Sequence, residues 1–423
     1  MAAQSIRAGN WRRVQLDSVF IGVVNASGTF LPVFLLRLGA SANDVGLLTA
    51  LPALTAFALA IPFGRYIQRR RNIVPWYSRL RLVAWASYAV MAGASALLPP
   101  AQAIPVILAI WALASLPSTA ALVGFAMVMD GAAGPGGRFD LLGRRWAIAG
   151  TVATVAVALG GQLLSVLAFP TNFEILLVIV SLAGLGSYFQ SSRIVIPDQV
   201  PVPREPSTPV RERLIGLWRL IVANRPFVRF ELRGFVYVLS FGLSMPILPL
   251  FYVHEVGAPD AWIGVIGAAG SAGSVLGYLV ARQLARRRGA TMTLLPSLLL
   301  GALAPAALSF IGWLPAVAVI AFVSGVAGAG AQLALFDQML RTIPHEHGVT
   351  FNSVDQSVAN GAIMIAPVIG GFLAVAIGVR MTLLVVAALG LAAFVLFAMD
   401  TVGRARVGDP RAPEPRVSEG GKH

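Results

Sequence analysis

Long hydrophobic runs separated by short polar stretches make up almost the whole chain, and twelve of them reach about 20 residues. A helix of that length crosses the hydrocarbon core of a bilayer, and backbone groups in lipid must form their hydrogen bonds within the helix. The pattern therefore predicts an all-α polytopic membrane protein with twelve transmembrane helices. They are expected to begin near Val14, Asp44, Trp76, Ala103, Trp146, Asn172, Glu231, Ala261, Thr291, Pro315, Phe351 and Val379.

One long polar segment interrupts the pattern between the sixth and seventh runs. It divides the chain into an N-terminal half, a linker, a C-terminal half and a tail with too little apolar content to fold alone. The expected bounds of these four parts are 1–190, 191–230, 231–400 and 401–423. The linker places apolar residues at helical spacing, which predicts an amphipathic helix on the membrane surface. These residues are Leu214, Leu217, Trp218 and Ile221.

The charges are few and concentrated on one side of the predicted spans. The chain is 57% hydrophobic and 12% charged, with a net charge of +14. Of its 32 basic residues, 30 fall at the amino end, the even-numbered connections, the linker or the tail, and Arg37 and Arg380 are the exceptions. This positive-inside pattern predicts cytoplasmic termini in a plasma-membrane protein, with the lipid bilayer rather than nucleic acid as partner.

Two stretches of the chain share a layout. "GASANDVGLLTALPALTAFALAIPFGRYIQRR" begins at Gly39, and 218 positions later "GAPDAWIGVIGAAGSAGSVLGYLVARQLARRR" begins at Gly257. Each has Gly-Ala, a polar turn, an apolar-Gly pair, a long apolar run and arginines. A second echo, "ALGGQLLSV" and "VIGGFLAVA", has an offset of 210. Two similar offsets indicate that the halves are repeats of one unit.

The order of Pro32, Gly39, Gly46, the arginines after the second span and the Gly-Gly pairs of spans five and eleven resembles the major facilitator superfamily. The resemblance covers essentially the whole chain. It implies two pseudo-symmetric six-helix bundles related by an axis along the membrane normal, which move a solute by alternating access.

Two motifs of that family are present in part. In the loop after span two, Gly64, Arg69 and Arg71 match, whereas Gln68 stands in place of an aspartate. The Pro-x-x-Gly-Gly pattern, which antiporters of the family tend to carry in span five, occurs instead in span eleven at Pro367.

The family resemblance implies that spans one, four, seven and ten line the pathway, and each carries polar or small residues at helical spacing. The candidate solute-binding residues are Asn25, Thr29, Trp111, Ser115, Tyr237, Ser240, Ser244 and Gln332. Hydroxyl groups often bond their own helix, so a structural role for the serines stays open. Asn25 and Gln332 carry amides that are costly in lipid without partners, which makes them the sharpest candidates.

Glycines of spans five, eight and eleven predict close helix contacts, because small residues let backbones approach. The expected packing residues are Gly160, Gly161, Gly267, Gly270, Gly273, Gly277, Pro367, Gly370 and Gly371. By the resemblance, span eight faces span five across the halves. The glycines either only pack there or also form a smooth seam on which one half rocks.

Peripheral charges suggest a gate. None of the 18 acidic residues is expected at the middle of a span, and Asp355 opens span eleven at the position equivalent to Arg145 of span five. An electrostatic latch between them across the cytoplasmic mouth is one interpretation, and simple solvated charges are the other. The candidate gate residues are Arg69, Arg144, Arg145, Asp337 and Asp355.

No catalytic motif is found. There is no HExxH or GxSxG pattern, and the single lysine, Lys422, lies in the tail, so a phosphate-binding loop cannot form. The "PHEHG" loop from Pro344 is a weak metal signal, and there is no cysteine. We expect no enzyme, no cofactor and no metal site.

The chain is therefore expected to be a monomeric secondary transporter of a small solute. Sparse polar residues favour efflux of amphipathic or uncharged molecules. Sugar or amino-acid uptake is the alternative within the transporter class, and a non-transporting sensor or scaffold is the alternative outside it. The substrate, the direction and a coupling proton or ion are not readable from the sequence.

Overall fold

The computed structural model describes residues 2–68, 70–134, 138–196, 210–288, 291–342 and 348–407, and these form helices joined by short connections. Twelve helical spans among the described residues are long and apolar enough to cross a membrane. The helices are α1 (Ala2–Asn25), α2 (Ser27–Leu38), α3 (Ala42–Gln68), α4 (Val74–Leu97), α5 (Pro100–Ala133), α6 (Arg138–Val166), α7 (Thr171–Ser191), α8 (Val210–Ala223), α9 (Arg225–Leu250), the π-helix η1 (Phe251–Glu255), α10 (Asp260–Arg288), α11 (Thr291–Phe310), α12 (Leu314–Thr342), α13 (Gly348–Ile377) and α14 (Val379–Val407).

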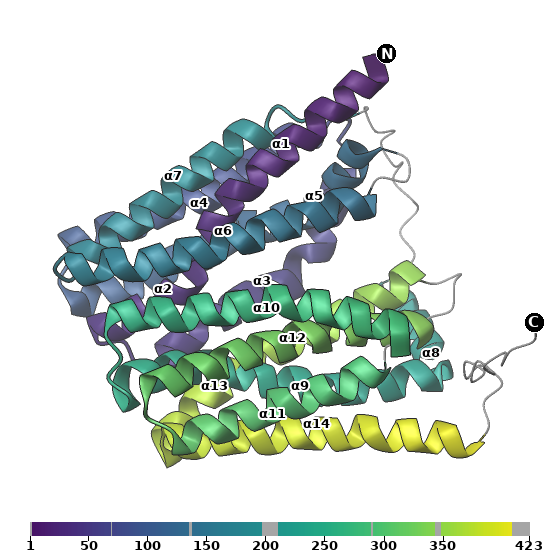
Figure 1. Cartoon of the computed structure of the whole chain (residues 1–423). Helices are drawn as coiled ribbons and strands as arrows, with labels where there is room; N and C mark the ends of the chain where they lie inside the picture. Colours follow the sequence, from purple (N-terminus) through teal and green to yellow (C-terminus); the bar gives the residue numbers. More distant parts are fainter. Residues whose placement is uncertain are drawn as a thin grey trace, which may run out of the picture.

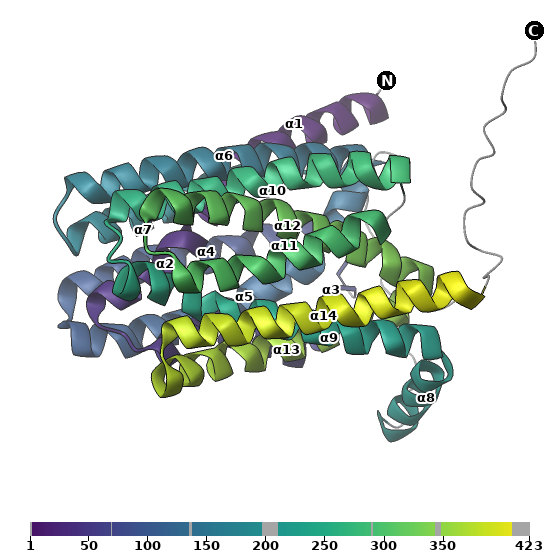
Figure 2. The same ribbon diagram turned by 60° about the horizontal axis from the view of Figure 1, so that its bottom comes forward.

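Several helices extend beyond the expected spans. The seventh begins at Arg225 instead of near Glu231, which places Glu231 almost two turns inside the helix. The last continues to Val407, into the segment expected as a tail. Arginines at such ends let a helix continue past the apolar core, because their long side chains keep the charge in water. The linker contains a helix, α8, which lies beside the start of α9 (Figure 2), and its place on the membrane surface remains a prediction.

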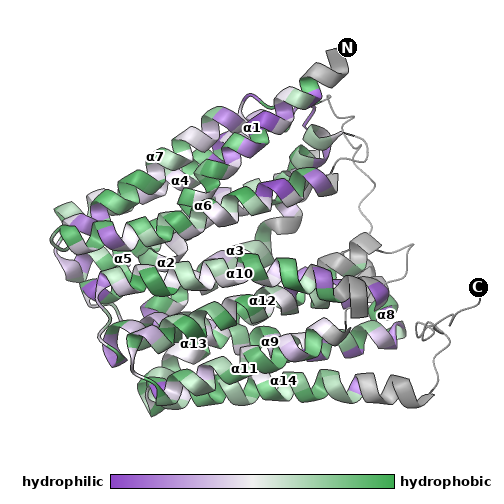
Figure 3. Cartoon of the chain, viewed as in Figure 1, coloured by the Kyte–Doolittle hydropathy of each residue, from purple (hydrophilic) through white to green (hydrophobic). Residues whose placement is uncertain are grey.

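Two bundles lie side by side (Figure 1). Helices α1–α7 form the N half and α9–α14 form the C half. The start of α1 and the end of α14 lie at the same end of the bundles, which we call the termini end, and the halves diverge towards it in the view of Figure 1. Hydrophobic residues dominate the middle of the helices, and hydrophilic residues gather near their ends (Figure 3). This distribution is what a bilayer requires of spanning helices.

The first span is interrupted, which the sequence analysis did not foresee. The break falls at Ala26, between α1 and α2, and the amide of Thr29 bonds the carbonyl of Ala26 in a tighter turn. Pro32 follows within α2 and removes the bond to the carbonyl of Gly28. Asn25 therefore occupies a helix end near the middle of the span.

The repeated Gly-Ala of the sequence has a backbone cause. Gly39 and Gly257 both adopt left-handed conformations, with φ of 97° and 60°, where a side chain would be strained. The alanines that follow, Ala40 and Ala258, are both buried. Each half thus uses the same tight turn to reverse the chain from its first span into its second.

Backbone contacts join the halves near the end opposite the termini. A Cβ on Gly161 of α6 would lie 2.5 Å from the Cα of Gly264 in α10. In the second seam, a Cβ on Gly46 of α3 would lie 2.8 Å from the carbonyl oxygen of Pro367 in α13. Gly46 and Gly264 are the matched glycines of the two repeats, so the fold has two equivalent seams.

The other expected packing glycines divide between the seams and each half's own core. Gly371 faces Ala42 of α3, and Gly267 faces Thr29 and Val157, so both lie between the halves. The glycines that precede Gly161 and Gly371 pack within their own halves, since Gly160 faces Phe30 and Gly370 faces Leu243. Gly270, Gly273 and Gly277 pack on α12 of their own half instead of on span five. The glycine ladder of span eight therefore serves two different contacts.

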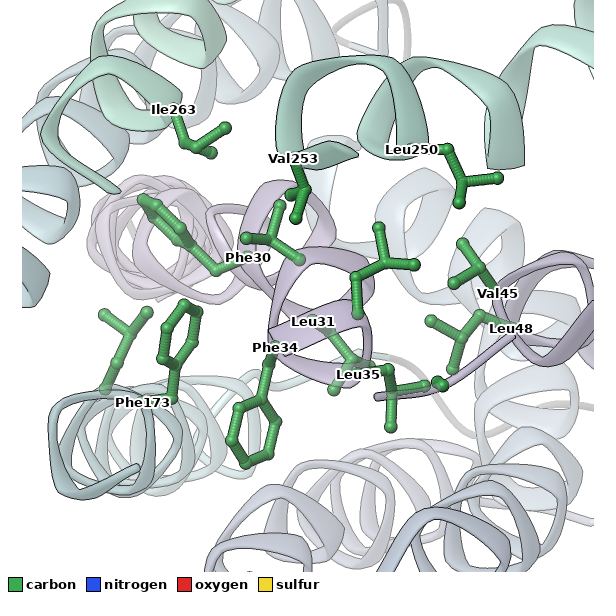
Figure 4. Packing of buried hydrophobic residues seen from close by; sticks show 14 of the residues in the cluster. Phe30, Leu31, Phe34, Leu35, Val45, Leu48, Phe173, Leu250, Val253 and Ile263 are labelled. Atoms are coloured by element: carbon green, nitrogen blue, oxygen red, sulfur yellow. The ribbon is translucent and has the colours of Figure 1, made fainter. Parts of the chain in front are cut away.

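Apolar side chains from both halves fill the space beside the seams. Phe30 and Phe34 of α2 lie in one buried cluster with Phe173 of α7, and Leu250 and Ile263 of the C half join it (Figure 4). Each of these five side chains is at most 4% exposed. The cluster closes the molecule at the end opposite the termini.

Gly161→Ala tests the seam. The added methyl group has no room against Gly264, and such overpacking costs about 1–3 kcal/mol. We expect a lower melting temperature for the purified variant. Gly143→Ala is the matched control on the same helix, because nothing lies within 4 Å of its Cβ position and alanine favours helix there. Equal melting temperatures for the two variants would contradict the seam.

The topology can be tested with single cysteines, since the chain has none of its own. Gln102 starts α5 at the end opposite the termini and Ser192 follows α7 at the termini end, and both are exposed. The basic residues predict that Gln102→Cys reacts with an impermeant maleimide on intact cells and that Ser192→Cys does not. The reverse labelling would refute cytoplasmic termini.

Candidate functional site

A cavity of about 770 Å³ lies mainly within the C half. Residues of α9, η1, α10, α11, α12 and α13 line it, together with Gly28, Thr29 and Val33 of α2. It extends from the apolar cluster towards the termini end, where Glu231 and Asp355 line it. We call it the C-half cavity.

A second cavity, of about 570 Å³, lies mainly within the N half, and we call it the N-half cavity. Its lining comes from α2, α3, α4 and α5, with four side chains of α9 and α13 added from the other half. The two cavities adjoin, because both are lined by Gly28, Met245, Pro249 and Ile363.

Five of the eight candidate binding residues line these cavities. Thr29, Tyr237 and Gln332 line the C-half cavity, and Trp111 and Ser115 line the N-half cavity. Protein partners already engage several of their polar atoms. They include the Oε1 of Gln332, which accepts a hydrogen bond from Tyr278, the Nε1 of Trp111, which donates to the carbonyl of Leu48 at 2.7 Å, and the Oγ of Ser115, which lies 2.6 Å from that of Thr55.

The remaining three candidates lie elsewhere. Ser240 is buried and donates to the carbonyl of Val386 in α14 at 2.9 Å, and Ser244 donates to the carbonyl of Phe241 in its own helix. Neither is among the residues that line the two cavities, so the structural interpretation of these serines fits their placement. Asn25 is exposed at the break in the first span, one turn before Gly28.

Prolines leave backbone acceptors where the cavities meet. Pro32 has no N–H to bond the carbonyl of Gly28, and Pro249 has none for the carbonyl of Met245. Gly28 and Met245 both line both cavities. Two corresponding prolines, one in the first span of each half, thus remove helical hydrogen bonds beside the junction of the cavities.

The gate candidate Arg145 lies in a buried charge network of the N half. Asp17, Arg81 and Arg145 are each at most 5% exposed. The Oδ1 of Asp17 accepts from Arg81 at 2.8 Å and from Ser187, and its Oδ2 lies 3.6 Å from a guanidinium nitrogen of Arg145. The guanidinium carbon of Arg145 also lies 4.8 Å from the ring centre of Phe125. Cation–π contact thus helps to hold two buried arginines against one carboxylate.

The predicted latch is not formed in this conformation, because Arg145 is paired with Asp17 while Asp355 lies beside Glu231. Asp337 pairs with Arg341 one turn along its own helix, at 2.7 Å. Arg144 is exposed, with its guanidinium carbon 5.6 Å from the ring centre of Trp11. Arg69 lies outside the described residues, as do four residues of the "PHEHG" loop.

A carboxyl pair in the C-half cavity was missed by the sequence analysis. Glu231 of α9 and Asp355 of α13 are neighbours in the lining of this cavity. The hydrophobic pattern puts Glu231 at the boundary of span seven. Because α9 begins at Arg225, Glu231 lies within the helix instead. Two amides on the same side of α13, Gln356 and Asn360, also line the cavities. Asp355, Gln356 and Asn360 follow each other within six residues of span eleven, and this group of polar residues was the signal in the sequence for a site on that helix.

An ion pair bridges the halves at the end opposite the termini. Arg37 of α2 donates to Asp260 of α10 at 3.0 Å and to the carbonyl of Ala258 at 2.8 Å. At the same end, Arg380 pairs with Glu255 at 2.9 Å, but both belong to the C half. The two arginines outside the positive-inside pattern are therefore both engaged in ion pairs, of which one holds the halves together.

Comparisons with known proteins agree with this architecture. The family model of the Major Facilitator Superfamily matches residues 232–421. A search of curated proteins returned no match.

Solved structures match nearly the whole chain. A mutant form of the nucleoside transporter NupG is 11% identical, with a TM-score of 0.74, and the match covers 92% of this chain and 99% of that chain. A bacterial homologue of the iron transporter ferroportin in its inward-facing state is 15% identical over 92% and 98% of the two chains, with a TM-score of 0.69. The outward-facing state of a bacterial ferroportin homologue is 18% identical over 93% and 99%, with a TM-score of 0.62.

At identities this low, the structural matches establish the fold alone. The family model adds a match in sequence to the C half. The chain is thus a twelve-span membrane protein with the fold of major facilitator transporters, and its C-terminal half carries the sequence pattern of the Major Facilitator Superfamily.

Proposed function

We propose that the chain is a secondary transporter that moves a small solute across the plasma membrane by alternating access. One observation carries the proposal: two cavities, one mainly in each half, adjoin where the halves meet, and contacts between the halves close the molecule at one end. Those contacts are the two glycine seams, the apolar cluster and the Arg37–Asp260 pair. A site between two rigid bundles can be exposed on either side by rocking one bundle on the other.

With the termini in the cytoplasm, this conformation is inward-facing. The C-half cavity then reaches the cytoplasmic ends of α9 and α13, and the closed end faces outward. Mainly apolar and aromatic walls suit an amphipathic solute, and this favours efflux of such molecules over uptake of sugars or amino acids. The Arg145–Asp355 latch remains a prediction for the opposite conformation, in which the termini ends of the halves meet.

The direct experiment is to screen a chemically broad panel of solutes for those that raise the melting temperature of the purified protein. A ligand that binds the folded state stabilises it by mass action. Stabilising solutes are then tested for uptake into sealed vesicles of both orientations, which decides the direction of transport. A protein that only senses its ligand would show stabilisation without flux.

Asp260→Asn tests the closed end. Loss of the ion pair with Arg37 removes a charge-assisted contact of about 1–2 kcal/mol from the inward-facing state, a shift of roughly five- to thirtyfold in the equilibrium between conformations. We expect Thr29→Cys, placed in the C-half cavity, to react faster with an impermeant thiol reagent from outside in this background.

The matched control is Glu255→Gln, which breaks an ion pair at the same end but within one half. It should leave the labelling of Thr29→Cys unchanged. Equal labelling in the Asp260→Asn and Glu255→Gln backgrounds would show that Arg37–Asp260 is not a gate.

Gln332→Ala and Asn25→Ala test the solute site. If these amides bind solute, apparent affinity should fall about tenfold or more while the melting temperature changes little, which is the loss of roughly one good hydrogen bond. Ser240→Ala is the structural control, because its buried bond to α14 predicts a loss of about 1 kcal/mol of stability with unchanged affinity. Lower stability with unaltered affinity in the amide variants would reject their role.

A further inference from the structure

Charge is distributed unevenly over the two cavities. Among the described residues that line the C-half cavity, the charged ones are Glu231 and Asp355, and no arginine, lysine or histidine is found there. The described lining of the N-half cavity is uncharged. This is notable in a chain with 32 basic and 18 acidic residues, because a random sample of its charges would be mainly positive.

The carboxyl pair has no basic partner among the contacts of the described residues. Glu231 and Asp355 are neighbours in the cavity lining, and the Oε1 of Glu231 is buried without a hydrogen-bond partner. Arg233, two residues after Glu231 in α9, is already paired with Asp400 of α14 at 2.8 Å. Two carboxyl groups in one cavity do not both ionise readily, so the pair carries a single negative charge over a range of pH, and this charge faces a cavity with no basic side chain in its described lining.

Aromatic rings line the same cavity as this charge. Phe230, Phe235 and Tyr237 of α9 line the C-half cavity, and Tyr278 and Phe336 line it from α10 and α12. Ring faces attract cations, and most strongly where water is excluded. Aromatic walls with one net negative charge are complementary to a large, weakly hydrated cation.

Backbone acceptors add to the polar lining where the two cavities meet. The carbonyls of Gly28 and Met245 lack their helical partners because of Pro32 and Pro249, and both residues line the junction with the N-half cavity. Beyond the junction, the hydroxyls of Ser27 and Tyr88 bond each other at 2.8 Å. The described lining of the N-half cavity is uncharged and suits the uncharged part of a solute, while backbone acceptors and both carboxyls belong to the lining of the C-half cavity.

From this arrangement we infer that the C-half cavity binds amphipathic organic monocations, with the cationic group near Glu231 and Asp355 and the apolar body directed towards the N-half cavity. The inference rests on the proposed transport function and names the substrate class of that site. A divalent metal ion fits less well, since among the described residues no group of three or more histidine, cysteine or acidic side chains comes together. Organic anions would lie against an uncompensated carboxylate.

Two ions of similar size and opposite charge test the substrate class. Tetraphenylphosphonium and tetraphenylborate are both large and apolar, so a preference between them reports charge. Binding of each is measured by equilibrium dialysis with the purified full-length chain. We expect the phosphonium to bind at least about tenfold more tightly. The attraction between one cation and one carboxylate in contact, at an effective dielectric constant of about 20, is larger than the free energy that corresponds to a tenfold change in affinity. Equal binding of the two ions overturns the inference.

The double variant Glu231→Gln/Asp355→Asn assigns the preference to the carboxyl pair. Amides keep the size of both side chains and can still bond each other, so the variant is expected to fold. Its affinity for the phosphonium should fall about tenfold or more, while Asp140→Asn, an exposed acid at the start of α6, leaves it unchanged. Unchanged binding in the double variant overturns the inference. If the double variant does not fold, Glu231→Gln with a wild-type melting temperature is judged by the same criterion.

The other outcomes separate this inference from the transport function. Stabilisation by manganese that depends on the carboxyl pair, without phosphonium binding, would replace the organic cation by a metal ion. If only an uncharged solute stabilises the protein, the inference of a cationic substrate fails, while the proposed transport function is unaffected. If Asp260→Asn also fails to change access to Thr29→Cys, the transport function fails as well, because that measurement involves no ligand.

Discussion

Close contact between backbones at the glycine seams is the constraint on which this structure depends. Helices in lipid gain little from hydrophobic burial, because lipid tails are as apolar as leucine, so their association relies on packing and on polar contacts. Gly161 against Gly264 and Gly46 against Pro367 bring the backbones of the two halves so close that an added Cβ would collide with the other half. The apolar cluster and the Arg37–Asp260 pair, which also join the halves, lie beside these two backbone contacts.

The seams also explain why polar groups in the two halves have different surroundings. In the N half, Asp17 holds Arg81 and Arg145 in a buried network with aromatic rings, so its charge is matched within the protein. In the C half, Glu231 and Asp355 face a cavity and have each other as partners. A matched buried network stabilises one arrangement of helices, whereas a carboxyl pair at a cavity is open to a ligand. Pseudo-symmetric halves have thus acquired different chemistry on the same scaffold.

Discontinuous helices connect the fold to the site. The first span breaks at Ala26, and the seventh ends in the π-helix Phe251–Glu255 after two prolines. Irregular backbone inside a membrane is tolerated where it lines a cavity, because its unpaired groups then meet water or solute instead of lipid. Both irregular spans lie at the junction of the two cavities, which places the free acceptors where a solute would pass.

The sequence by itself determined the number of spans, the division into two repeats and the Gly-Ala turns. Hydrophobic run length and backbone conformation are local properties, and a bilayer accepts few alternatives to a helix. It also identified five residues that line the cavities, because a three-to-four spacing marks one face of a helix. Spacing cannot say which face of a helix meets a cavity. Ser240 is three residues after Tyr237, yet it lies against α14 and not in the cavity.

Only the tertiary structure decided which charges meet. Arg145 and Asp355 occupy equivalent positions in the repeats, yet Arg145 pairs with Asp17, 128 residues earlier in the chain, and Asp355 with Glu231. Those partners depend on how helices rotate and where they begin, and a six-residue change in the start of α9 was enough to move Glu231 from the boundary into the cavity. Local patterns fix helices, but the partner of a buried charge is set by helices distant in the sequence, since each charge must find its counterpart in three dimensions.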